Sequence, residues 1–297
     1  MKNRWILNLV MLALVAGLVA FLYLRPKANT GEASLHEVTT LKLADFNSIK
    51  VEFPTQAPTT FEKVDGLWRM TAPYKTRADQ QSVQRILSII AAKSSEKFAT
   101  TDMEKFGLNN PQLRLKLNGE KGAEEFVFGT FNTVTDDQYV AYKDSVYLLP
   151  GSYAEAATTQ AIELIDKTPL TVSEVKQISG LNFARLEQWE ESAMTVDVAD
   201  GQWKTNVANA KITQNEMNEW LDFSWKQAQA KQVEQYKPDR KITYPSFEIK
   251  LKDGNKVHFD KIQESPDLLL GRPDEGLLYH FSNDVGFNML NPPLNIK

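Results

Sequence analysis

The chain has 297 residues, of which 42% are hydrophobic and 24% are charged, as in ordinary globular proteins. This length suits one large domain or two ordinary ones and excludes a protein that is largely disordered, collagen-like or multi-span. The 34 Lys and Arg residues against 38 Asp and Glu give a net charge of -4, without the basic excess that nucleic-acid binding needs. We therefore expect no nucleic acid among its partners.

A membrane anchor is predicted for residues 5–24. The stretch from Trp5 to Leu24 holds one polar side chain, Asn8, and a helix of roughly 20 apolar residues spans the hydrocarbon core of a bilayer. The amino-terminal charge slightly favours an arrangement in which residues 1–4 form a cytoplasmic tail and the body lies outside the cytoplasm. A cleaved signal peptide is the alternative, but its apolar stretch is typically shorter, about 7–15 residues.

A polar tether, residues 25–41, connects this segment to the body, and the body contains an internal repeat. Trp68 aligns with Trp203 at an offset of 135 (203 − 68), and Leu87 aligns with Leu221 at 134 (221 − 87). Pro111 aligns with Pro245 at the same 134. A period of domain size indicates a tandem duplication and not a short-period solenoid. We therefore predict a first α+β repeat at residues 42–170 and a second at residues 171–297.

The residues after the two prolines alternate between apolar and polar, as in half-buried strands, and both stretches end at a Gly-containing turn. A helix is predicted to begin at Asp79 in the first copy. In the second copy Thr213 and Glu216 have the spacing of a capping box. Each helix carries one apolar stripe. The expected fold is α+β, with two units of antiparallel sheet and one main helix packed on each.

The first copy contains several short motifs: Leu67-Trp68, Ala78-Asp79, the run from Phe106 to Pro111, Phe128-Gly129, Tyr139-Val140 and the run from Tyr147 to Leu149. Together they resemble the bacterial family called domain of unknown function 4340. The likeness covers residues 42–175 and reaches the second copy through the duplication, where Tyr244-Pro245 replaces the longer motif. The resemblance implies an accessory protein of the bacterial inner membrane with its body in the periplasm, in some members beside ABC-type transporters or gliding-type machinery. It supplies no catalytic residue.

No catalytic, cofactor or metal site is predicted. The chain has no Cys and three His, and it lacks a nucleophile elbow and a Gly-rich phosphate loop. Three acidic pairs were considered for acid/base chemistry or cation binding and are interpreted as solvated turn residues: Asp136-Asp137, Glu190-Glu191 and Asp274-Glu275.

The remaining predictions concern mainly the tryptophans. Trp68 and Trp203, with Pro111 and Pro245, are interpreted as structural anchors of the repeat, because a large ring kept in two diverged copies is typical of packing. Trp189, Trp220 and Trp225 have no aromatic counterparts in the first copy. They are therefore candidate contacts for a partner protein.

Two functions remain open at this stage. The first is a non-catalytic accessory or scaffold subunit that contacts lipid through residues 5–24 and binds other proteins of a membrane complex. The alternative is a membrane-tethered hydrolase or a small-molecule binding protein that uses a cleft between the two repeats. Carboxylates converging from both copies in one concave site would favour the hydrolase.

Overall fold

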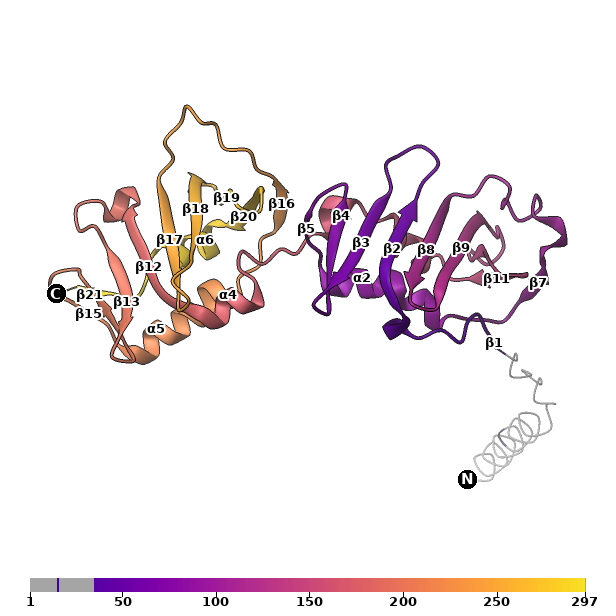
Figure 1. The fold of residues 1–297 in the computed structure, drawn as a ribbon, viewed down its shortest axis with the longest axis horizontal. Helices are drawn as coiled ribbons and strands as arrows, with labels where there is room; N and C mark the ends of the chain where they lie inside the picture. Colours follow the sequence, from indigo (N-terminus) through magenta and orange to yellow (C-terminus); the bar gives the residue numbers. More distant parts are fainter. Residues whose placement is uncertain (1–14, 16–34, 297) are drawn as a thin grey trace, which may run out of the picture.

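The computed structural model describes Val15 and residues 35–296. They form two units placed end to end (Figure 1): an N-terminal unit of residues 35–165 and a C-terminal unit of residues 172–296, joined by a linker of residues 166–171. The predicted anchor, apart from Val15, and residues 25–34 of the predicted tether lie outside the described residues. Within the described residues, no helix is long and apolar enough to cross a bilayer.

The N-terminal unit is built on a nine-stranded antiparallel sheet. Its order is β5 (Thr76–Arg77), β4 (Leu67–Ala72), β3 (Thr59–Val64), β2 (Phe46–Glu52), β8 (Leu113–Gly119), β9 (Gly122–Phe131), β10 (Gln138–Tyr142), β11 (Ser145–Leu149) and β7 (Lys97–Ala99). A small separate pair, β1 (His36–Glu37) and β6 (Lys93–Ser94), lies beside it. The predicted alternation in β8 is confirmed, because Leu113, Leu115 and Leu117 are buried while the residues between them are half-buried.

The C-terminal unit has an eight-stranded antiparallel sheet. Its order is β14 (Gln202–Thr205), β13 (Thr195–Ala199), β12 (Ile178–Arg185), β17 (Ser246–Leu251), β18 (Lys256–Gln263), β19 (Asp267–Arg272), β20 (Leu277–Ser282) and β16 (Gln232–Gln235). This is the order of the first sheet without a counterpart of β5. The residues that occupy that place, β15 (Ala210–Lys211), pair instead with β21 (Asn295–Ile296).

Each sheet is covered by helices on one face. The N-terminal unit has α2 (Gln80–Leu87) and α3 (Ser152–Thr158), and the C-terminal unit has α5 (Gln214–Leu221), a π-helical turn at Asp222–Lys226 and α6 (Asn283–Leu290). A further short helix, α4 (Val172–Gln177), follows the linker. The expectation of one main helix in each unit is therefore incomplete, because α3 and α6 add a second, shorter one. Both helices are short, and their sequences show no clear apolar stripe.

Of the two predicted helix N-caps, one is confirmed and the other is wrong. Asp79 caps α2, and its carboxylate accepts a hydrogen bond from the Ser82 amide at 2.7 Å. Thr213 is the residue before α5, but its side chain makes no capping bond, so the predicted capping box is wrong. A genuine capping box occurs instead at α4, where Thr171 and Glu174 bond to each other's backbone amides at 3.1 and 2.7 Å.

A second layer covers the far face of β9, β10 and β11 in the N-terminal unit. Phe106 and Leu108 close over Val127, Ala141 and Val146, which are all buried. This close packing requires glycines: a Cβ atom at Gly129 would lie 2.1 Å from the carbonyl oxygen of Phe106, and one at Gly107 would lie 2.4 Å from Thr130. The family-like residues Phe106 to Leu108 and Phe128-Gly129 are thus explained by packing.

Candidate functional site

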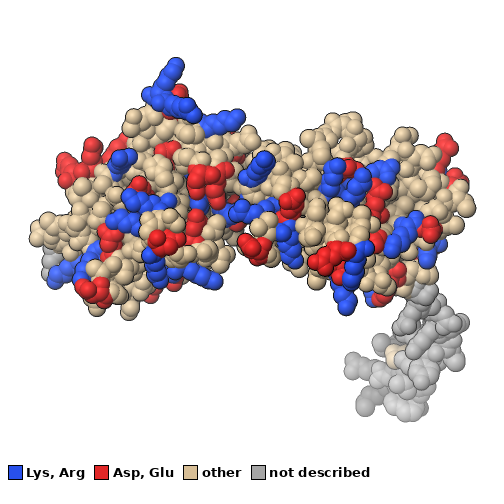
Figure 2. Space-filling view, viewed as in Figure 1, with Lys and Arg blue, Asp and Glu red and all other residues tan. Residues whose placement is uncertain are grey.

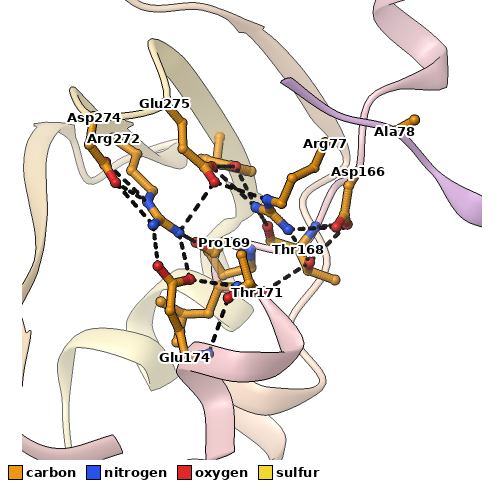
Figure 3. Close-up of polar contacts among 12 residues, drawn as sticks. Arg77, Ala78, Asp166, Thr168, Pro169, Thr171, Glu174, Arg272, Asp274 and Glu275 are labelled. Atoms are coloured by element: carbon orange, nitrogen blue, oxygen red, sulfur yellow. Dashed lines mark hydrogen bonds and ion pairs between the residues drawn. The ribbon is translucent and has the colours of Figure 1, made fainter. Parts of the chain in front are cut away.

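A network of charged side chains lies at the junction of the two units (Figure 3). Two buried arginines define it, Arg77 on β5 and Arg272 on β19, which are 8% and 2% exposed. Between them runs the linker. Most buried apolar residues of both units also form one contiguous cluster, so the polar contacts sit within continuous packing.

Arg77 reaches from the N-terminal unit to both the linker and the C-terminal unit. Its Nε and Nη2 donate to the two carboxylate oxygens of Glu275 at 2.9 and 3.2 Å, and Nη1 donates to Asp166 at 2.5 Å. Nη2 also donates to the carbonyl oxygen of Thr168 at 2.7 Å and to the hydroxyl of Tyr279 at 3.1 Å. The fork geometry of guanidinium suits such simultaneous binding of a carboxylate and backbone.

Arg272 binds the other end of the linker. Its Nη1 donates to the carbonyl oxygen of Pro169 at 2.7 Å and to Glu174 Oε2 at 3.0 Å, while Nη2 donates to Glu174 Oε1 at 2.5 Å. Its Nε donates to Asp274 at 3.1 Å. Glu275, already bound by Arg77, lies 3.7 Å from Arg272 Nη1. Glu275 therefore connects the two arginines.

The electrostatics keep these groups ionised. Burial lowers the pKa of Arg77 and of Arg272, but carboxylates, chiefly Glu275 and Glu174 respectively, more than offset it and raise both pKa values above the ordinary range. Burial raises the pKa of Glu174, yet hydrogen bonds from Arg272 and Thr171 outweigh it, so the pKa lies below its usual 4.5. Burial and then the nearby Glu275 charge raise the pKa of Tyr279. A neutral tyrosine can donate to Glu275, as it does at 2.7 Å.

This arrangement can hold two bodies together, but it has little capacity for acid/base chemistry. Carboxylates from the linker and the C-terminal unit do converge here, but guanidinium groups bind each of them. A general acid or base needs a carboxyl that can exchange its proton with substrate. Among the described residues, no group of three or more His, Asp or Glu is placed to hold a metal ion.

The sequence does not predict this site. It predicts that the pair Asp274-Glu275 consists of solvated turn residues. This is wrong for Glu275, whose side chain is 15% exposed, while Asp274 is 58% exposed. One signal was available for Arg272: it continues the inward phase of Leu268 and Leu270 in an alternating strand, where a charged residue needs a partner. Arg77, in a strand of two residues, gave no such signal.

The two predicted anchor tryptophans make the same hydrogen bonds with a glutamine at the start of the next helix, which the sequence did not predict. Gln80, the first residue of α2, bonds to the amide and carbonyl of Trp68, both at 2.9 Å. Gln214, the first residue of α5, does the same to Trp203 at 2.7 and 2.9 Å. Trp68 is 7% exposed, whereas Trp203 is only half-buried and its indole donates to Asn218 at 3.0 Å. Pro111 and Pro245 stand just before β8 and β17.

The three tryptophans predicted to contact a partner have internal roles. Trp225 is 1% exposed and packs among Phe247 and Phe259 at ring-centroid distances of 5.5 and 5.7 Å, so its prediction as a partner contact is wrong. Trp220 and Trp189 are half-buried. Their indole N–H groups donate to the carbonyl oxygens of Asn288 and Leu290 at 2.6 and 3.0 Å. They thereby satisfy carbonyls that the last turn of α6 leaves free.

The molecule is thus an α+β protein of two antiparallel units joined by an ionic junction. The chain belongs to the family described as domain of unknown function (DUF4340), whose family model matches residues 68–243, from β4 across the junction to the segment before β17. The predicted resemblance is confirmed. No curated protein and no solved structure matches the chain.

Proposed function

We propose that the protein is a non-catalytic accessory or scaffold subunit of a bacterial inner-membrane complex, held by residues 5–24 with its two-unit body in the periplasm. The apolar sequence of residues 5–24 supports the anchor. We also infer that the two units arose by tandem duplication, since the aligned residues fall in strands of the same order.

The observation that carries this proposal is the junction. A cleft between repeats is where the alternative, a hydrolase, would place its acids, but Arg77 and Arg272 bind the carboxylates there. The same contacts tie the linker to both units. Such a junction favours a body that presents its two units in one orientation, as a scaffold requires, over a site that turns over substrate.

The test is purification of the full-length tagged protein from its native membranes in mild detergent. Co-purifying proteins are identified by mass spectrometry against a variant that lacks residues 1–24. We expect a stoichiometric partner with the full chain. A full-length protein that emerges alone would overturn the proposal, and cleavage of glycan or peptide substrates by that protein would then favour the hydrolase.

A further inference from the structure

The N-terminal unit carries a groove of about 610 Å³ on the side of β2 and β8. Its apolar part consists of Phe53, Pro54, Pro58, Pro111 and Leu113. Its volume lies within the range of about 300–1,000 Å³ common for ligand sites. The groove lies away from the junction and shares no residue with it.

The groove also has a polar side, where the cation Arg114 makes only a long ion pair. Lys50 and Glu52 line it and pair at 2.7 Å, and Lys116 pairs with the same Glu52 at 2.8 Å. Hydrogen bonds from Lys116 and Lys50 lower the pKa of Glu52, so it stays ionised. Among the described residues, Arg114 forms an ion pair with Glu125 alone, at 3.5 Å, the outer limit of a hydrogen bond, and its side chain is 39% exposed. Its guanidinium can therefore take a carboxylate from an occupant.

The second repeat shows that the fold does not impose this groove. The equivalent cavity, beside β12 and β17, has about 220 Å³ and is lined mostly by polar residues. At the position of Arg114 stands Glu248, which pairs with Lys256 at 2.8 Å. One scaffold therefore has a large, partly apolar groove with Arg114 in one copy, and a small polar cavity with Glu248 at the equivalent position in the other.

We propose that the groove is a docking site for an extended segment of a partner protein that carries an apolar side chain and, close to it, an Asp or Glu. The inference rests on the proposed function. The apolar side chain would lie among the prolines and Phe53, and the carboxylate would bind Arg114. Residues 54–57, Asn109 and Asn110 beside the groove are exposed. An open groove suits a chain that passes through it better than a small molecule, which pockets usually enclose.

The direct test measures binding of labelled decapeptides to the full-length protein in detergent. One set alternates Leu or Phe with Asp, and a second set has Lys in place of Asp. The wild-type protein is expected to bind the acidic set at least tenfold more tightly, and Arg114→Glu is expected to abolish or reverse this preference. Glu248→Arg, at the equivalent position of the second repeat, and Arg240→Glu, an exposed residue elsewhere, should leave it unchanged. Equal binding of both sets, or a preference that survives Arg114→Glu, would overturn the proposal.

A second test uses native membranes and separates this inference from the proposed function. A photo-crosslinking amino acid at Asn110 should form an adduct with a partner segment that is both apolar and acidic, and one at the equivalent Tyr244 should not. Loss of the partner with Arg114→Glu but not with Glu248→Arg supports the groove. A partner that co-purifies equally with Arg114→Glu refutes the groove and leaves the scaffold function standing, whereas no partner in any sample refutes the scaffold function itself.

Discussion

The two units of this chain use the same strand order, apart from β5, and differ in the layers and sites built around that sheet. Both keep the glutamine that bonds to the backbone of a tryptophan, and both bury the inward phase of their central strands. Only the N-terminal unit adds the layer formed by Phe106 and Leu108, with the groove beside it. At the corresponding place in the C-terminal unit, the ring of Tyr236 covers Gly271, and its hydroxyl donates to Asp260 at 2.7 Å.

This contrast separates residues that maintain the fold from residues free to acquire a role. What both copies share is explained by packing and backbone hydrogen bonds. What differs is the junction, the groove and the aromatic core around Trp225. Over the face shown in Figure 2, positive and negative side chains are mixed on both units. Functional differences between the units therefore reside in local sites and not in a field of one sign.

The largest effect is expected from Trp225→Ala, which removes a fully buried ring from the core of the second repeat. The free energy of unfolding should fall by about 3–5 kcal/mol. Trp220→Ala should cost less, because that ring is half-buried. Urea denaturation of both variants checks the order, and an equal or reversed loss would contradict the assignment of Trp225 to the core.

Arg77→Met comes next. It leaves the buried carboxylate of Glu275 without its main partner, and breaking a buried ion pair costs about 3–5 kcal/mol. We expect a value near the lower end, about 3 kcal/mol, because Asp166 keeps access to solvent. The matched control is Lys211→Met, the exposed counterpart, which should change stability by less than about 0.5 kcal/mol. Similar losses of stability in both variants would show that the ion pairs of Arg77 contribute no more than an exposed lysine does.

Gln80→Ala and Gln214→Ala test what the units share. Each variant leaves the amide and carbonyl of a tryptophan without a side-chain partner, and we expect a loss of about 1 kcal/mol in each case. Hydrogen exchange should accelerate at Trp68 and Trp203 respectively. If protection is lost in one unit only, the hydrogen bonds between glutamine and tryptophan backbone are not equivalent in the two copies.

The smallest expected effect is on acid stability through Glu174, which has no counterpart in the first repeat. Its pKa is lowered in the folded protein, so around pH 4 the unfolded chain binds more protons and stability increases with pH. The contribution is complete above pH 4.5 and is lost as the pH falls through the folded pKa. Urea midpoints measured between pH 7 and pH 3 should fall less in Glu174→Gln than in the wild type, and identical slopes would contradict this assignment.

The elements that could be predicted are those whose pattern is local. Alternation identified β8 and β17, and the Asp79 side chain marked the start of α2. The junction could not be predicted in the same way, because Arg77 and Glu275 are 198 residues apart in sequence and only the folded chain brings them together. Trp220 and Trp225 lie in consecutive helical turns, but Trp220 is half-buried and Trp225 lies in the core.

The junction joins unlike surfaces, the β5 side of one unit and the β16–β20 side of the other, and such head-to-tail contacts do not close on themselves as a two-fold contact does. In principle a third unit could be added at either end, and so could a whole second molecule, giving a fibre. The two outer ends do not carry the arginines of the junction, since Lys211 stands at the place of Arg77 and Tyr142 at the place of Arg272. Neither residue has the guanidinium fork that binds a carboxylate and a backbone carbonyl together, so the outer ends cannot repeat the contacts of the junction, which disfavours such growth.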